Sequence, residues 1–429
     1  MAIANVNSPT TAVVAPASST RVALAVVTSL FFMWGFVTVL NDVLVPHLKS
    51  IFDLKYAKAS LIQSAFFLAY FIFSIPSAKL IDWVGYKKTM VVGVVVMGLG
   101  ALLFIPAAIV PSYPLFLAAL MVLAGGITAL QVAANPYVAV LGPPETASSR
   151  LNLSQAFNSL GTAIAPYLGG LLILSAKSTD MNVVRQMSAD ALQTYRVQEA
   201  SSVKLPYLVI GLALISLAVA ISFFKLPPMP GAEHHKGDPA AGSVWKHPNL
   251  VFGVVGIFLY VGAEVSIGSF LINYFNQSNI GNISESAAAK YVSLYWLGAM
   301  VGRFIGSTIL QKVRTGTVLG LAAMAASGLV CISILTSGHV AMWSIILVGF
   351  FNSVMFPSIF TLGIAELGPL TGDGSGLLIM AIVGGAVIPF AQGALADRIG
   401  LHHAFILPAI CYLYIVYYAF RGSRPLATA

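Results

Sequence analysis

A lone carboxylate, Asp42, stands in an apolar segment that is long enough to cross a lipid bilayer. It is the only Asp, Glu, Lys or Arg between Val22 and Leu48. A charged side chain at bilayer depth costs about 2.5–3.5 kcal/mol on insertion scales, so it must face protein, water or a transported ion or solute. Pro46 weakens the helix just after it. The position predicts a place on an ion or substrate path, and the alternative is a structural carboxylate that caps or pairs inside a helical bundle.

Two further apolar segments carry amide side chains at helical spacing. Gln131 and Asn135 are four residues apart on one segment, and Gln155 and Asn158 are three apart on the next. Each amide offers donors and an acceptor, which suits sugar hydroxyls that both donate and accept. Hydrogen bonds between helices would explain single amides, and we interpret Asn152 in that way. Two stripes exceed what packing needs, so we expect the other four residues to bind substrate.

Three more residues complete the predicted substrate-binding set. Asn41 lies directly before Asp42, and Glu264 is the one acid well inside an apolar segment of the second half of the chain. Trp296 offers an aromatic face on which a pyranose ring can stack, although ordinary membrane packing explains it equally well.

The composition excludes several classes of protein. Hydrophobic residues make up 58% of the 429 residues, charged residues only 8%, and the mean hydropathy is +0.90. Soluble domains carry about 25% charged residues, so this is a polytopic membrane protein. The net charge of +8 is scattered over short loops, which argues against nucleic acid. Cys331 and Cys411 lie in apolar segments, and the sequence has no phosphate loop and no His/Cys cluster, so we expect no disulfide, metal, cofactor or catalytic site.

Apolar stretches of about 20 residues, each long enough to cross a bilayer, occur in two sets of six. They fall near residues 22–48, 57–81, 89–110, 114–141, 151–175, 205–224, 248–275, 291–311, 315–336, 341–365, 375–396 and 401–420. We predict an all-α protein with twelve transmembrane helices in two pseudo-symmetric six-helix bundles. The predicted parts are a disordered cytoplasmic N-terminus (1–20), an N-terminal bundle (21–225), a cytoplasmic linker (226–246) and a C-terminal bundle (247–429).

Loop charge predicts the orientation. Most Lys and Arg residues fall on one side when both termini and the linker are cytoplasmic, as the positive-inside rule requires. A long loop from about Ser175 to Lys204 then lies outside.

A weak internal repeat supports two equivalent halves. Residues 135–142 align with residues 356–363 at an offset of 221 residues, with a proline and a glycine in common. The same offset brings Asp42 to within one position of Glu264. Paired halves that rock around a central site are a known transporter design.

A short loop between the second and third apolar stretches combines an acid, a glycine and two lysines. Asp82, Gly85, Lys87 and Lys88 resemble the Asp-x-x-Gly-(Arg/Lys)-(Lys/Arg) signature of the major facilitator superfamily. The resemblance implies that the acid and the cations clamp neighbouring helix ends in one gating state. Arg303, near the end of 291–311, occupies the related place in the second half, and we group it with this gating loop.

The first 160 residues carry the strongest family resemblance, which extends over essentially the whole chain. The matching motifs are Phe31-Phe-Met-Trp-Gly35, Leu40-Asn-Asp42, Ile62-Gln-Ser-Ala-Phe66, Ala133-Ala-Asn-Pro-Tyr137, Leu141-Gly-Pro143 and Arg150-Leu-Asn-Leu-Ser-Gln155-Ala-Phe-Asn158. They resemble the fucose permease family of sugar symporters, and within it the bacterial glucose/galactose transporters.

The resemblance implies that Asp42 is the proton-coupling acid. It also exposes a departure, because the second functional acid of the fucose permease, in the fourth span, is replaced by Gln131. An amide cannot titrate, so either Asp42 alone carries the proton or coupling differs, for example through Na⁺.

The sequence therefore favours a monomeric, proton-coupled hexose symporter of the glucose/galactose type. It would work by alternating access in the bacterial inner membrane. Alternatives are a Na⁺-coupled sugar symporter, a drug/proton antiporter of the same fold and a membrane sugar sensor. A membrane transferase would need a paired-acid or metal site that the loops lack, and we disfavour an organophosphate exchanger because we expect no arginine deep in a span.

Overall fold

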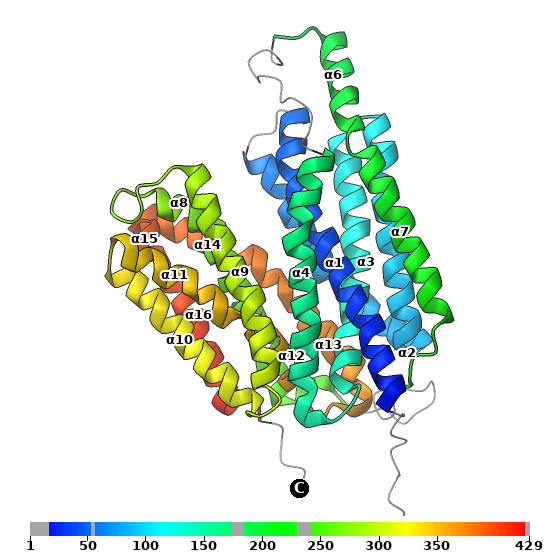
Figure 1. Cartoon of the computed structure of the whole chain (residues 1–429), viewed down its shortest axis with the longest axis vertical. Helices are drawn as coiled ribbons and strands as arrows, with labels where there is room; N and C mark the ends of the chain where they lie inside the picture. The colour runs from blue at the N-terminus through cyan, green and yellow to red at the C-terminus, as the bar shows by residue number, and fades with distance from the viewer. Residues whose placement is uncertain (1–16, 53–55, 174–183, 185, 230–241, 425–429) are drawn as a thin grey trace, which may run out of the picture.

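The computed structural model describes residues 17–52, 56–173, 184, 186–229 and 242–424 (Figure 1). Within these ranges it leaves undescribed the side chains of residues 17–19, 41–47, 49–50, 56–61, 169–173 and 189. All regular structure in the described ranges is helical, in agreement with the predicted all-α class. The first helix begins at Ala17, so the last residues of the predicted disordered N-terminus are helical.

The described residues of the first half of the chain form six α-helices. They are α1 (Ala17–Phe52), α2 (Tyr56–Ile109), α3 (Tyr113–Val140), α4 (Ala147–Ile173), α6 (Ala189–Ser201) and α7 (Lys204–Phe223), with a short 3-10 turn η1 (Pro144–Thr146) before α4.

Helix α2 holds two of the predicted spans in one 54-residue element. A straight helix of that length would measure about 80 Å, far more than the roughly 30 Å of a bilayer core. The chain bends at Gly85, where φ is 81° and ψ is 167°, a conformation that only glycine adopts readily. The predicted turn between 57–81 and 89–110 is therefore present, and it depends on a glycine.

The second half is more interrupted. Its helices are α8 (Pro248–Asn276), α9 (Glu285–Ile309), α10 (Thr315–Leu335), α11 (Gly338–Asn352), α12 (Met355–Gly363), α13 (Thr371–Met380), α14 (Gly384–Ile399), α15 (Leu401–Ala404) and α16 (Ile406–Tyr417). Between and around them lie the 3-10 turns η2 (Val244–Lys246), η3 (Gly368–Leu370) and η4 (Ala381–Val383) and the π turn η5 (Tyr418–Gly422).

Three predicted spans, 341–365, 375–396 and 401–420, are each built from two shorter helices rather than one. In the first of them α11 ends at Asn352 and α12 begins at Met355. The ring of Pro357 clashes with the carbonyl four residues earlier and removes a backbone donor, which explains the break.

Nine helical segments of the described chain are long and apolar enough to cross a membrane. One of them, Ile62–Ile109, has 48 residues and accounts for two crossings. Helices α4 and α9 are not among the nine, because polar side chains along them lower their hydropathy. They are also two of the helices through which the halves of the protein meet.

The long outer loop predicted from about Ser175 to Lys204 contains helix α6, which the sequence analysis did not assign. The helix projects beyond the rest of the bundle (Figure 1). The side chain of Ser188 caps its first turn by accepting a hydrogen bond from the Ala191 N–H. Arg196 anchors it by donating to the Ile51 carbonyl at 3.2 Å. The predicted loop is thus partly ordered on the surface of α1.

The two halves touch at one end of the molecule, which we call the closed end. It is formed by the beginning of α4 and the end of α9, and the described ends of the chain lie there too (Figure 1). Toward the opposite end the halves diverge (Figure 1). Hydrogen bonds that join the halves link Ser148 Oγ with Thr361 Oγ1 (2.5 Å), Ser149 Oγ with the Ser307 carbonyl (2.6 Å) and Ser375 Oγ with the Val132 carbonyl (2.7 Å).

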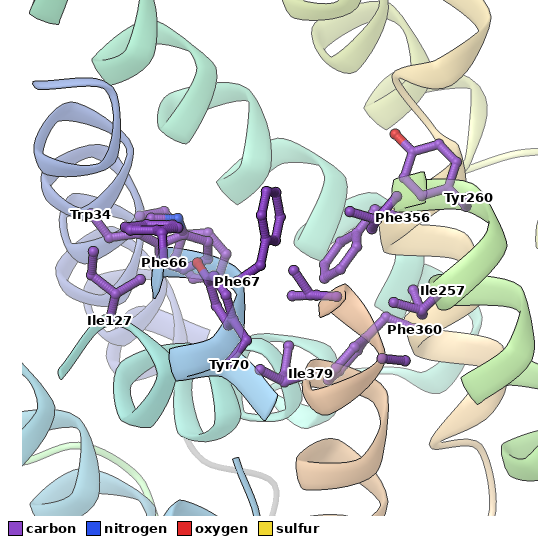
Figure 2. Packing of buried hydrophobic residues seen from close by; sticks show 14 of the residues in the cluster. Trp34, Phe66, Phe67, Tyr70, Ile127, Ile257, Tyr260, Phe356, Phe360 and Ile379 are labelled. Carbon is purple, nitrogen blue, oxygen red and sulfur yellow. The ribbon is translucent and has the colours of Figure 1, made fainter. Parts of the chain in front are cut away.

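A second seam between the halves runs along α2, α13 and the start of α14. A Cβ added at Gly376 would lie 2.8 Å from the Ala78 Cβ, and one at Gly385 would lie 2.5 Å from the Phe67 ring. In Figure 2 Phe67 lies between two groups of buried side chains, one around Trp34 and the other around Phe356. Glycine at these places lets the helices of the two halves approach closely.

We expect Gly376→Leu to separate the halves at the closed end. The added side chain would overlap Ala78, and overpacking of this kind costs about 1–3 kcal/mol. The distance between spin labels on cysteines introduced at Glu145 and Gln311, both exposed at the closed end, should therefore shift to larger values. Gly328→Leu is the matched control, since a Cβ there meets nothing within 4 Å. An unchanged distance distribution in Gly376→Leu would contradict the tight seam.

Candidate functional site

The predicted coupling residues Asn41 and Asp42 lie in helix α1, but their side chains are outside the described part of the structure. Helix α1 is held firmly against α4 one to two turns before them. A Cβ added at Gly35 would lie 2.6 Å from the Asn158 Nδ2, and one at Gly161 would lie 2.9 Å from the Phe36 nitrogen. The backbone thus places Asp42 on the helix that packs against the amide stripe of α4.

The amide of Gln131 is buried and paired. Its Nε2 donates to the Tyr70 hydroxyl at 2.7 Å, which links α3 to the first leg of α2. Only 4% of the Gln131 side chain is exposed. A buried amide in this position holds one donor in place and leaves its carbonyl oxygen as an acceptor.

Gln155 and Asn135 face each other from α4 and α3. The Gln155 Nε2 lies 3.5 Å from the Asn135 Oδ1, a long contact, and the Asn135 Nδ2 is buried with no hydrogen-bond partner. Asn158, one turn farther along α4, donates to the Phe31 carbonyl of α1 at 2.9 Å. Buried polar atoms usually find partners, so the free donor of Asn135 is suited to a ligand or a water.

Arg303 crosses from one half to the other. Its Nη1 donates to the Ser159 hydroxyl and lies 3.4 Å from the Gln155 carbonyl, both on α4. The Arg303 carbonyl in turn accepts from the Asn152 Nδ2 at 2.7 Å. Among the residues of α4 that bond to the second half, Ser159 is the farthest from the start of the helix, so the bridge lies near the middle of α4.

Glu264, the predicted binding residue of the second half, lies on α8. Its Oε1 is buried without a hydrogen-bond partner, while the Tyr260 hydroxyl lies within hydrogen-bonding reach of the carboxylate and the charge of Arg303 acts on it. The Tyr260 hydroxyl donates to the Asn352 carbonyl at 3.0 Å, and the Asn352 Nδ2 donates to the Tyr295 hydroxyl at 2.8 Å. A polar network therefore surrounds the one deep acid of the second half.

Trp296 takes no part in these networks. It is 45% exposed, and its ring meets the Tyr295 ring edge-on with 5.1 Å between the ring centroids. The Trp296 ring also lies close to Gly268, because a Cβ added there would be 2.9 Å from it. Its predicted stacking on a sugar ring stays a prediction.

The turn at Gly85 is tied to neighbouring helices. Lys87 donates from its Nζ to the Ser222 carbonyl at the end of α7 (2.8 Å), which places a cation at the negative end of that helix. Asp82 reaches toward the second half, since its Oδ1 would lie 3.8 Å from a Cβ at Gly372. Lys87 thus connects two helix ends, and Asp82 lies beside the start of α13. The predicted clamp formed by Asp82, Lys87 and Lys88 stays a prediction.

The described part of the chain offers no candidate metal centre, because no three His, Cys, Asp or Glu side chains come together there. Both cysteines are free, and Cys411 is buried.

A sequence model of the Major Facilitator Superfamily matches residues 22–382. The chain belongs to the major facilitator superfamily. It is 51% identical over 402 residues to a glucose/galactose transporter of Brucella abortus, with 94% of each chain covered. It is 35% identical over 415 residues to the L-fucose-proton symporter of Escherichia coli, with 94% of this chain and 93% of the symporter covered.

Among solved structures, the superfamily transporter FucP in the outward conformation matches with a TM-score of 0.88 and 34% identity. The match covers 95% of this chain and 100% of FucP. The predicted fold class, two six-helix bundles of the major facilitator type, is confirmed, and so is the family that the sequence motifs indicate. The protein is a transporter of this superfamily and not an enzyme.

Arg303 lies near the end of helix α9, which agrees with its predicted place near the end of the 291–311 span. It is part of a helix and not of a loop like the one around Gly85, and its predicted gating role stays a prediction. An organophosphate site still has little support, because the Arg303 guanidinium already donates to the Ser159 hydroxyl and the Gln155 carbonyl.

Sequence reasoning missed three residues of this superfamily member. Tyr70 and Ser159 were overlooked because their partners, Gln131 and Arg303, lie far away in sequence. Arg150 binds the last turn of α3 through the carbonyls of residues 138 and 139, at 3.2 and 2.5 Å. Burial lowers the pKa of the Arg150 guanidinium to about 10, so it is still charged at neutral pH. An arginine in the first turn of the helix that follows the Gly142-Pro143-Pro144 turn was the available signal.

Proposed function

We propose that the protein is a hexose symporter of the glucose/galactose type in the bacterial inner membrane. The observation that carries this proposal is the set of buried amides on α3 and α4, with the unpaired Asn135 donor, close to where Arg303 joins the halves. Such groups match the paired donors and acceptors of a sugar. The Brucella glucose/galactose transporter, at 51% identity, supports a hexose as cargo.

The proposed carrier works by alternating access, with residues 21–225 and 247–429 as the two moving bundles and 226–246 as their linker. Residues 230–241 of that linker lie outside the described ranges, and the Tyr137 hydroxyl holds its start by donating to the Pro227 carbonyl at 2.8 Å. Both termini and the closed end face the cytoplasm. The closed end then blocks the inner side, and Asp82, Gly85, Lys87, Lys88 and Arg303 stabilise that state. The monomer is the working unit.

Proton coupling is assigned to Asp42. The Escherichia coli L-fucose-proton symporter, at 35% identity, supports a proton as the coupled ion. Asp42 takes a proton from the outer side, which lowers the cost of moving the binding site across the membrane, and releases it inside. Because Gln131 cannot titrate, Na⁺ is the competing coupled ion.

The proposed substrate-binding residues are drawn from both halves. They are Asn41, Gln131, Asn135, Gln155, Asn158, Glu264 and Trp296. The first five come from the first bundle and supply most of the hydrogen bonds, so sugar recognition rests mainly on α1, α3 and α4.

Uptake of labelled glucose, galactose and fucose into proteoliposomes tests the function. We expect glucose or galactose to accumulate when an inward proton gradient is imposed, and not when a Na⁺ gradient alone is imposed. Accumulation that is driven only by a Na⁺ gradient would show that Na⁺, and not the proton, is the coupled ion. Hexose binding without movement would favour a sensor, and export of apolar drugs without hexose uptake would favour an antiporter.

Gln155→Ala is expected to weaken hexose affinity by about 1–3 kcal/mol, the loss of a hydrogen bond in a partly dry site. Asn158→Ala should do the same and also lower the melting temperature, since it removes the bond from α4 to the Phe31 carbonyl. Isothermal titration of the purified variants measures both effects, with the exposed Gln311→Ala as control. Wild-type affinity in both variants would mean that this stripe serves only packing.

A further inference from the structure

We propose that Asn352 is a positioning residue for the second half of the sugar site. It ties Tyr260 of α8 to Tyr295 of α9. Through these two tyrosines it holds Glu264 and Trp296 in one fixed arrangement. The ligand that this arrangement suits is a pyranose ring, so the inference rests on the proposed hexose transport and adds a residue to it.

Asn352 lies at the break between α11 and α12, where it binds two other helices at once. It is the last residue of α11 and is completely buried. The end of a helix leaves its last carbonyls without partners inside the helix, and the Asn352 carbonyl accepts from the Tyr260 hydroxyl of α8 at 3.0 Å. The Asn352 Nδ2 donates to the Tyr295 hydroxyl of α9 at 2.8 Å. One residue thus joins α8, α9 and α11 through two hydrogen bonds.

Each of the two tyrosines lies next to a predicted binding residue. Tyr260, Glu264 and Gly268 are spaced four residues apart, so they share one face of α8. Tyr295 directly precedes Trp296 on α9, and their two rings meet edge-on. The Trp296 ring also reaches α8, because a Cβ added at Gly268 would lie 2.9 Å from it. The indole therefore lies against α8 one turn beyond Glu264.

These residues form an exposed layer with a buried network behind it. Glu264 and Trp296 are both partly accessible, the second of them at 45%. Asn352, Tyr260 and Tyr295 are buried and have no access to a ligand in this state. Buried hydroxyls need hydrogen-bond partners, so the positions of the two tyrosines depend on Asn352. Asn352 thus acts on a ligand only through the residues that it holds.

The spacing of the exposed layer bears on the choice of sugar. The face of Trp296 can stack on a pyranose ring, and the Glu264 carboxyl group can hydrogen-bond its hydroxyls. With the two side chains held at a fixed separation, only some hydroxyls of a stacked ring can reach Glu264. Glucose and galactose differ in the orientation of one hydroxyl. A loosened wall should therefore lose affinity and the preference between these two epimers together.

Distances between α8 and α9 test the positioning without sugar. Cysteines that replace the exposed Ser269 and Ser293 carry spin labels, and Cys331 and Cys411 are replaced by Ala. Dipolar broadening of the spectra measures the distance between the labels. Asn352→Ala removes the donor to α9 but keeps the carbonyl that binds α8. We expect it to widen the distribution of distances between the labels.

Binding of glucose and galactose to the purified protein is the second measurement. We expect Asn352→Ala to weaken binding of the preferred hexose about tenfold and to bring the ratio of the two affinities toward one. Tyr295→Phe keeps the ring and removes only the hydroxyl, so it should act in the same direction and serves if Asn352→Ala does not fold. The double variant should bind no more weakly than Asn352→Ala, because both changes remove the same bond.

Tyr274→Phe is the matched control. It also removes a buried hydroxyl from α8, but this one lies 2.9 Å from the Ser333 Oγ, outside the network of Asn352. It should lower the melting temperature and leave the label distances and hexose binding unchanged.

Three results would overturn the positioning role. They are unchanged label distances in both Asn352→Ala and Tyr295→Phe, an equal change in Tyr274→Phe, and widened distances with wild-type hexose binding, which would make Asn352 purely structural. Because the label measurement contains no sugar, widened distances in variants of a protein that binds no hexose would overturn the hexose transport and not the positioning.

Discussion

Asp42→Asn is expected to abolish concentrative hexose uptake while sugar exchange across the membrane continues. The substitution keeps the size and much of the hydrogen bonding of the side chain but removes its titration. Only steps that load or release the proton need that titration, so equal exchange of internal and external sugar proceeds without it. One coupled proton supports about a tenfold sugar gradient per unit of imposed pH difference, and this accumulation should fall to unity in the variant.

The measurement compares gradient-driven accumulation with counterflow in the same proteoliposomes. Glu285→Gln is the matched control, because it neutralises an exposed acid at the start of α9 and should leave both activities unchanged. Full accumulation by Asp42→Asn would show that another group carries the proton. Loss of both accumulation and exchange, with the protein correctly folded, would assign Asp42 to sugar binding.

Much of the fold could be predicted because the bilayer imposes simple rules on sequence. Apolar length located the helices, and the glycine and charges around Gly85 located the turn inside α2. Breaks within spans were harder to predict from the sequence. The end of α11 at Asn352, for example, depends on Pro357, which lies several residues later. Helix α6 was missed because a polar exposed helix carries no apolar stripe to signal it.

The candidate site could be predicted only in part. Spacing along one helix identified Gln131, Asn135, Gln155 and Asn158, because residues three or four apart share a face. It could not reveal that Gln131 is bound to Tyr70, 61 residues away. Nor could it bring Arg303 against Ser159, 144 residues away, since that contact depends on how the halves pack in this state.

The Tyr70 contact decides what Gln131→Glu should do. At present the Gln131 Nε2 donates to the Tyr70 hydroxyl, and the side chain is almost fully buried. A carboxylate cannot donate, so the hydroxyl would have to turn and donate to it instead. Burial disfavours the charged form of the new carboxyl, and we expect its titration to be coupled to that of Asp42.

We therefore expect Gln131→Glu to add a protonation step to transport. The pH profile of hexose uptake should change from one titration to two, and hexose affinity should fall about tenfold if the Gln131 amide donates to the sugar. Uptake and binding measured from about pH 5 to about pH 8 report both effects. The double variant with Tyr70→Phe should widen the separation of the two titrations, because the carboxylate loses the one donor placed to stabilise it.

Gln277→Glu supplies the matched control, since it makes the same chemical change at the end of α8, away from this network. It should leave the pH profile and the affinity as they are. A folded Gln131→Glu protein with unaltered affinity and a single unaltered titration would show that position 131 only fills space beside Tyr70. In that case the absence of a second acid on α3 has no functional consequence, and proton coupling must be sought in Asp42.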